Sequence, residues 1–379
     1  MSNPIFIARQ DTLENDILPA HWLSQYKLFG EESYTFQDKE IWKKLCMSRA
    51  AANDRDMHAE ALEEMLTTFS AEHTGKWMLL IYGLDAAVLE GLATMAAIAA
   101  NGTAMAAVAG NALLMHAITN SQTAMRAIAN SQTAMHAIAN SETAMQRIAN
   151  STTAMDAIGG SKIARDAVQA SPYYDAKIKE NDMAIAKLVV GFANLESARY
   201  SGCAGMAADS TAMTAIAASS TAMNAVAASS TAMTAVAASG VALKAIAQAY
   251  KKTANMLQFL KAVNASDTLV KRIYSTLTNA TALFGAAQLG SQDSVENANS
   301  WATTSAAPNA FLACACGYYG SSSDSVSVTY NGTVIAQKKT GTKQPGSVAS
   351  TNVNAITMAP STFTENGDGY LAVQKFTAK

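Results

Sequence analysis

SQTAMRAIAN-SQTAMHAIAN-SETAMQRIAN, residues 121–150, repeats one ten-residue pattern three times. The same decad extends in both directions, because methionine occupies every tenth position from 95 to 155. Isoleucine or valine follows three residues after each of these methionines. The pattern returns with a shifted phase at Met213, Met223 and Met233. A fixed short period indicates that each unit is one structural element of an array.

A single continuous helix does not explain this period. Ten residues at about 100° each rotate the Met–Ile stripe by about 80° per unit. A period of about 3.33 residues also lies outside the range of coiled coils. The decads therefore favour one short helix each, separated by breaks.

The ends of the decads support this prediction. With methionine as the fifth position, the first position always carries an N-cap residue, and the tenth position of the first array carries Gly or Asn. Gly and Asn tolerate the left-handed conformation that ends many helices. We therefore predict helices of about seven or eight residues, with breaks at 120/121, 130/131 and 140/141. The first-position residues are Asn101, Asn111, Ser121, Ser131, Ser141, Ser151, Ser161, Ser171, Asp209, Ser219, Ser229 and Ser239.

Helices this short are unstable alone in water, so they must stack on their neighbours. In 131–140 we expect Met135 and Ile138 as the larger core groups, with alanines 134, 137 and 139 at positions of close approach. Each unit then contacts the next, as in a solenoid. The sixth position varies freely, so we expect it to face solvent. The histidines at this position, His116 and His136, are then exposed residues and not metal ligands.

The regions around the arrays have different compositions. SDSVSVTYNGTVIAQKK alternates β-branched and polar residues around Asn331-Gly332, which predicts a type I′ hairpin. NAFLACACGYYG and GYLAVQKFTA predict further strands. The expected fold class is α+β, mainly α: a solenoid-like stack of short helices, then a sandwich-like antiparallel β-domain. The predicted divisions are an N-terminal helical docking domain (1–90, with a helix over 56–70), a first array (91–170), a helical spacer (171–208), a second array (209–249), a helical connector (250–299) and the β-domain (300–379).

The composition argues against several functions. The chain has 379 residues, of which 78 are alanine and 19 methionine, and its net charge is −2, so no global field attracts nucleic acid or an anionic membrane. The apolar stretch 77–100 contains Asp85 and Glu90, which favours a buried helix over a membrane span. The chain start lacks a basic, apolar export signal. We expect a protein that is made in the cytoplasm without a signal peptide.

No catalytic motif is present, so we predict no enzyme, no cofactor and no metal. The four cysteines are too few for a disulfide framework, and Cys314-Ala-Cys316 has no partner motif for zinc. Asp324 and the run 365–369 (ENGDG) lack the ligand spacing of a calcium loop, and turn chemistry explains the run.

Aromatic residues gather among Ser, Thr and Gly near the C-terminus. Rigid aromatic rings among adaptable polar residues suit surface recognition, although such rings also pack β-sandwich cores. The candidate surface-recognition residues are Trp301, Tyr318, Tyr319, Tyr330 and Tyr370.

Decads of the form S-x-TAM-x-A-(I/V)-A-(N/A) resemble segments of tail-fibre and other appendage proteins of tailed bacteriophages. The ending ENGDGYLAVQKFTAK is similar to the last strand of β-domains in such proteins. The resemblance covers about 95–250 and, more loosely, 300–379. It implies a structural protein of the virion, bound to other virion proteins and to itself, with a homotrimer as the first guess. It also implies contact between an exposed β-domain and a host-surface glycan or protein.

Two other classes remain open. A bacterial surface adhesin or stalk shares the layout of a repeat region and a β-domain, but requires an export signal. An ice-binding helix is suggested by the Thr and Ala periodicity, but requires threonines on one flat helix face, whereas these decads break at every cap.

Overall fold

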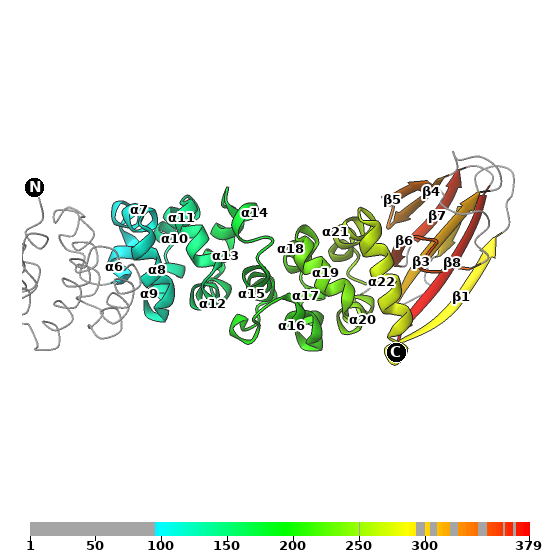
Figure 1. Cartoon of the computed structure of the whole chain (residues 1–379), viewed down its shortest axis with the longest axis horizontal. Helices are drawn as coiled ribbons and strands as arrows, with labels where there is room; N and C mark the ends of the chain where they lie inside the picture. The colour runs from blue at the N-terminus through cyan, green and yellow to red at the C-terminus, as the bar shows by residue number, and fades with distance from the viewer. Residues whose placement is uncertain are drawn as a thin grey trace, which may run out of the picture. The chain divides into compact units, whose positions relative to one another are not determined.

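The computed structural model describes residues 95–249, 251–292, 300–303, 309–318, 325–339, 347–358, 361–366 and 369–379. The predicted domain 1–90 and its helix lie outside these residues. The chain divides between Ile178 and Lys179 into two compact units, the first unit and the second unit, which are described separately. The described residues are mainly helical and end in antiparallel strands, which confirms the α+β, mainly α class (Figure 1). Within them, no single helix is both long and apolar enough to cross a membrane.

In the first unit each decad forms one short helix. The predicted breaks are confirmed, because helices end at Asn120, Ala129 and Ala139. The helices are α6 (Met95–Ala100), α7 (Gly102–Gly110), α8 (Ala112–Asn120), α9 (Gln122–Ala129), α10 (Gln132–Ala139), α11 (Glu142–Ala149), α12 (Thr152–Gly160), α13 (Lys162–Gln169) and the one-turn α14 (Tyr174–Lys177).

The change of direction is made by the N-cap residue. Ser131 has φ −105° and ψ 117°, an extended conformation between two helices. Its side chain accepts a hydrogen bond from the Ala134 N–H, as predicted for this position. The tenth-position residue is not left-handed, contrary to the sequence-based expectation, since Asn140 has φ −93° and ψ 3°. Its side-chain amide donates to the His136 carbonyl at 2.9 Å, which also accepts from the Asn140 backbone N–H at 3.2 Å.

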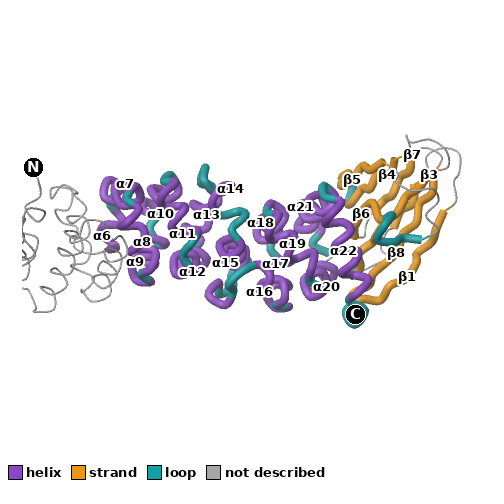
Figure 2. The backbone as a smooth tube through the Cα atoms, in the orientation of Figure 1, coloured by secondary structure: helices purple, strands orange, loops and turns teal. Residues whose placement is uncertain are grey.

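Each helix of the first unit packs mainly against the helix three places earlier. Thus α10 packs on α7, α11 on α8, α12 on α9 and α13 on α10 (Figure 2). Consecutive helices are strongly bent, by 99° between α7 and α8. The main stacking contact therefore joins units three decads apart, whereas the sequence analysis expected it between neighbours, which meet less extensively at the breaks.

Between residues 101 and 160 the core uses the same four positions of every decad, whereas in 161–170 Arg165 replaces the methionine and Gln169 is exposed. In α10 Ala134, Met135 and Ile138 are fully buried and Ala139 is 6% exposed, which confirms the buried methionine column. Full burial of each large side chain stabilises the fold by about 1.5–3 kcal/mol, which compensates for the marginal stability of an eight-residue helix. The variable sixth position is exposed at His136, as predicted. Ala137 is only half-buried and does not belong to the core, contrary to the expectation.

The first-position serines also join helices that lie far apart along the chain. Ser151 Oγ accepts from the Ala154 N–H at 3.2 Å and donates to the Thr119 carbonyl at 2.5 Å. The donor and acceptor residues are 32 positions apart, and this separation is constant along the first unit. We call these bonds the serine ladder: Ser131 to Ala99, Ser141 to Ala109, Ser151 to Thr119, Ser161 to Ala129 and Ser171 to Ala139.

Replacing a ladder serine is expected to destabilise the first unit. Ser151→Ala removes an N-cap and leaves a buried carbonyl unpaired, for an expected loss of about 1–3 kcal/mol. Ser151 is 8% exposed, so water does not readily replace the lost bond. Urea unfolding of the full chain measures the loss. Ser220→Ala, an exposed serine one position after a cap, serves as the control, and equal midpoints for the two variants would contradict the role of the ladder.

The second unit begins with a departure from prediction. Residues 171–200 do not form one amphipathic helical stretch. They form α14, then α15 (Asp182–Phe192), whose residues from Ala184 to Phe192 are all buried, and the short 3-10 helix η3 (Ser197–Arg199). Even the lysine of this helix is buried: Lys187 is 1% exposed, and its ammonium group donates to the Ser197 carbonyl at 3.1 Å.

The second array again forms one helix per decad, with a 94° bend between α19 and α20. α15 packs on α18, α16 on α19, α17 on α20, α18 on α21 and α19 on α22. Ser239 Oγ donates to the Ala207 carbonyl, again 32 residues earlier. The helices are α16 (Cys203–Ala208), α17 (Ser210–Ala218), α18 (Ser220–Ala228), α19 (Ser230–Ala238), α20 (Gly240–Gln248), α21 (Thr253–Asn264) and α22 (Asp267–Asn279).

The C-terminal strands form two four-stranded antiparallel sheets, ordered β1-β8-β3-β6 and β2-β7-β4-β5. The predicted hairpin is confirmed, because β4 and β5 pair around Asn331 (φ 47°) and Gly332 (φ 77°), as a type I′ turn requires. The strands are β1 (Phe284–Gln292), β2 (Ser300–Thr303), β3 (Ala310–Tyr318), β4 (Ser325–Tyr330), β5 (Thr333–Lys339), β6 (Val353–Met358), β7 (Ser361–Asn366) and β8 (Gly369–Ala378). Strand β1 lies inside 250–299, which the sequence analysis assigned to a helical connector.

The last two helices attach these sheets to the second array. Asn264, at the end of α21, donates to the Ile356 carbonyl at 2.8 Å and accepts from the Ile356 N–H at 3.0 Å. Tyr274 of α22 donates to the Val348 carbonyl at 2.7 Å. Toward the array, Thr276 donates to the Ala237 carbonyl at 2.8 Å. Helices and sheets of the second unit are therefore coupled through buried hydrogen bonds.

Candidate functional site

The structure distributes the candidate aromatic residues over both sheets. Trp301 lies in β2, Tyr318 at the end of β3 and Tyr370 near the start of β8, while Tyr319 lies outside the described residues. Tyr318 pairs with Gly369 and Gly317 pairs with Tyr370, which brings two of the candidates to the same end of one sheet. Trp301 pairs with Phe363 in the other sheet.

Tyr330 is a wrong prediction as a surface residue. Its side chain is fully buried at the end of β4, because the last residue of the hairpin strand faces the interior. Its hydroxyl has no hydrogen-bond partner, and burial raises the pKa of Tyr330 to about 12. Tyr330 is therefore a core residue and cannot contact a receptor.

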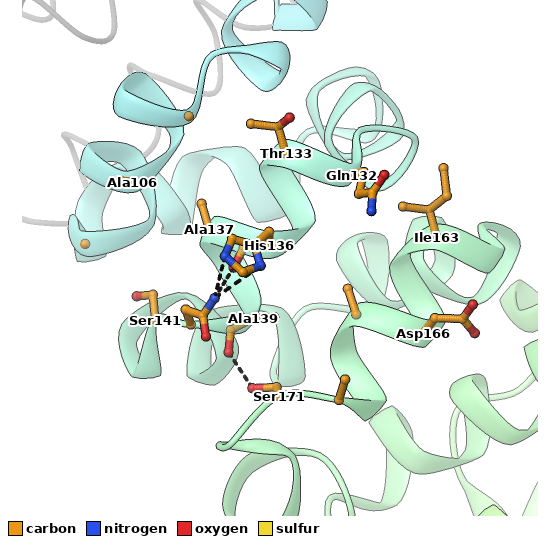
Figure 3. A pocket seen from close by; sticks show the side chains of 15 residues that line it. Ala106, Gln132, Thr133, His136, Ala137, Ala139, Ser141, Ile163, Asp166 and Ser171 are labelled. Atoms are coloured by element: carbon orange, nitrogen blue, oxygen red, sulfur yellow. Dashed lines mark hydrogen bonds between the residues drawn. The ribbon is translucent and has the colours of Figure 1, made fainter.

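A groove of about 1190 Å³ lies on the first unit, across the outer faces of α7, α10 and α13 (Figure 3). Small residues form much of its lining, among them Gly102, Ala106 and Ala137. Its titratable lining residues, His136 and Asp166, lie on separate helices, and the Asp166 carboxylate points away from His136. The groove therefore offers apolar surface and scattered polar groups, without a pair placed for proton transfer.

One lining residue departs from the repeat. Ile163 occupies the third position, where most decads have threonine, and its side chain is 43% exposed. Next to it, Lys162 pairs with Asp166 at 2.5 Å on the solvent side.

Carboxylates gather where the chain enters the second unit. Asp209 caps α17 by accepting from the Thr211 and Ala212 N–H groups, and it accepts from the Tyr200 hydroxyl at 2.8 Å. Hydrogen bonds from Ala212 and Tyr200 hold the pKa of Asp209 below its ordinary value. Sequence reasoning identified Asp209 only as an N-cap.

Glu180 makes the densest set of side-chain bonds in this region. Its carboxylate accepts from the Ser230 N–H at 3.0 Å, the Ser230 hydroxyl at 2.7 Å, the Thr231 N–H at 3.0 Å and the Thr231 hydroxyl at 2.9 Å. Glu180 thereby occupies the N-terminus of α19, 50 residues along the chain. No motif marks such a contact, so the sequence analysis missed it.

The cysteines of the described residues are buried free thiols. Burial, together with nearby Asp182, raises the pKa of the Cys203 thiol well above its ordinary value, so it is not a reactive thiolate. Within the described residues no three His, Cys, Asp or Glu side chains are placed to hold a metal ion. Asp324 lies outside the described residues, and the run 365–369 spans the connection between β7 and β8.

The chain matches no protein-family model, and a search of curated proteins finds no significant match.

Proposed function

We propose that this protein is a structural component of a bacteriophage virion, a tail fibre or a related appendage. Its repeats act as a spacer, and its C-terminal strands form an exposed domain that contacts the host surface or another virion protein. The proposal starts from the resemblance of the decads to phage appendage sequences.

The serine ladder is the observation that carries the spacer role. Every bond joins residues 32 positions apart, so each added decad repeats the same caps and the same core. Such an array extends a chain without requiring a new fold for each unit. We propose that it is a solenoid, with three helices to each circuit.

A domain that binds a receptor must also be firmly attached to the helices that carry it. The buried pairing of Asn264 with Ile356 and the bond from Tyr274 to Val348 supply such an attachment. We propose that the two sheets form a sandwich, and that Trp301, Tyr318, Tyr319 and Tyr370 contact the receptor. Assembly as a homotrimer is part of the same proposal, since most oligomers have closed symmetry.

Immunogold electron microscopy tests this function. An antibody against the purified full chain is applied to lysates of the producing bacterium and to intact cells. Gold on an appendage of tailed particles is the expected result. Gold on the surface of cells that release no particles would instead establish the alternative, a bacterial adhesin or stalk.

A competition experiment tests whether the C-terminal strands bind the receptor. Purified full chain, added at about ten times its own dissociation constant for the receptor, is expected to reduce adsorption of the particles about tenfold, because it occupies the receptor by mass action. The double variant Trp301→Ala, Tyr370→Ala is expected not to compete, whereas Tyr330→Phe, a change in the core, is expected to compete fully. Competition by the double variant equal to that of the unaltered chain would refute these contact residues.

A further inference from the structure

The chain enters the second unit at Lys179, and the next residue fixes it there. Besides the four bonds to the Glu180 carboxylate, the Thr231 hydroxyl reaches the Glu180 carbonyl at 3.2 Å. Side chain and backbone of one residue therefore hold the entering segment on the first turn of α19.

A second contact lies two residues further on. Asp182 Oδ1 accepts from the Cys203 N–H at 3.0 Å, at the start of α16. Gly202 permits this approach, because a Cβ at this position would lie 2.1 Å from Asp182 Oδ2. The segment 179–182, which we call the entry segment, is thus attached to two helices of the second unit.

The attachment differs in kind from the serine ladder. Serine hydroxyls do not titrate, so the ladder is independent of pH, whereas the hold on α19 depends on an ionised carboxylate. A charged acceptor strengthens each bond, and protonation replaces one acceptor with a donor.

The surroundings leave Glu180 as the titrating group of this contact. Helices α17, α18 and α19 carry no titratable side chain. On the elements around it, α15 carries Asp182 and the buried Lys187, and α16 carries Cys203, which interacts with Glu180. Helices α20 and α22, which also pack on α19, carry Lys244, Asp267, Lys271, Arg272 and Tyr274. Asp209 caps α17 and binds Tyr200, with Arg199 on the preceding 3-10 helix.

We propose that Glu180 is an acid-released latch, which holds the entry segment on α19 at neutral pH and frees it on protonation. Release frees residues 179–181, which precede α15, from the first turn of α19.

The titration of Glu180 gives the direction of the effect. Burial alone would raise its pKa, but the hydrogen bonds from Ser230 and Thr231 outweigh it and hold the pKa below the ordinary value. A carboxyl whose folded pKa is depressed stabilises the fold fully above its unfolded pKa. That contribution is lost as the pH falls through the folded pKa. The latch is therefore closed at neutral pH and opens in acid.

Hydrogen exchange of the full chain, followed by NMR from about pH 6 to about pH 2.5, tests the latch, because the lower limit lies well below the ordinary pKa of a glutamate. The reference amide is Ala222, which is capped by Ser219 in the same unit. After correction for intrinsic rates, protection of the Ser230 and Thr231 amides is expected to fall about tenfold relative to Ala222. In Glu180→Gln their protection is expected to be low at every pH.

Two results would overturn the proposal. One is protection at Ser230 and Thr231 that does not change with pH in the unaltered chain. The other is equal loss at Ala222, which would show that acid unfolds the whole unit and does not release a local latch.

Trypsin provides an independent measurement at neutral pH, because Lys179 is the first residue of the entry segment and Lys177 lies two residues before it. Cleavage there is expected to be about tenfold faster in Glu180→Ala than in the unaltered chain. Asp166→Ala, which removes an exposed carboxylate of the first unit, is expected to leave the rate unchanged. Equal rates for both variants would refute the latch.

Discussion

Met135→Asp is expected to unfold the helices of the first unit around α10 at room temperature. The methionine side chain is fully buried, and its helix α10 packs on both α7 and α13. An unpaired charge in such a site costs several kcal/mol, comparable with the stability of a whole domain. Hydrogen exchange followed by mass spectrometry is expected to show lost protection in α7, α10 and α13.

The neighbouring residue provides the matched control. His136→Asp places the same carboxylate on the exposed side of the same helix and is expected to change stability by no more than about 0.5 kcal/mol. Met135→Leu keeps the volume and apolar character of the core and is expected to cost less than about 1.5 kcal/mol. Equal loss of protection in Met135→Asp and His136→Asp would contradict the assignment of the inner and outer faces.

Asn264→Ala is expected to separate the sheets from the helices of the second unit. The change leaves both backbone groups of Ile356 without partners at a site where Asn264 is 2% exposed. Each unpaired buried group costs about 1–3 kcal/mol, so a total loss of about 3 kcal/mol is expected. Urea unfolding followed by tyrosine and tryptophan fluorescence measures it.

Asn279→Ala tests whether this effect belongs to the buried site. Asn279 is also the last residue of its helix, but its amide bonds only the Ser275 hydroxyl and is solvent-accessible. Its replacement is expected to cost less than about 0.5 kcal/mol. A loss as large as that of Asn264→Ala would assign the effect to helix ends in general.

The helices were predictable because their signals are local. A cap residue, an apolar pair and a variable sixth position recur in the decads, and each acts through its own helix. The packing of each helix on the helix three places earlier was not predicted, because it depends on the bend at each cap. One signal for it was present: serine dominates the first position, although Asn and Asp cap helices equally well. In the ladder one hydroxyl oxygen both accepts and donates, as Ser151 shows, whereas a carboxylate only accepts and an amide carries its donor and acceptor on separate atoms.

The strands were less predictable than the helices, because some of them have no local sequence signal. SVSVTY and TVIAQKK were identified by alternation and by Asn331-Gly332, whereas FGAAQLGSQ, now β1, contains no β-branched residue. Its pairing with β8 decides its conformation, and that contact joins residues about ninety positions apart. Tyr330 failed as a surface candidate for a related reason, since composition does not reveal which face of a strand is covered.

The constant separation along the serine ladder has a consequence for how the gene can change. Near-identical decads in coding DNA invite recombination between copies, which adds or deletes whole units. A ladder serine bonds a backbone carbonyl, which every residue supplies, so the ladder forms again across a deletion. The outer side chains do not share this tolerance. Within the first unit, loss of one decad makes each later helix pack on helices of a different set, whereas loss of three returns each helix to its own set. Selection on an outer surface would therefore favour length variants that differ by three decads.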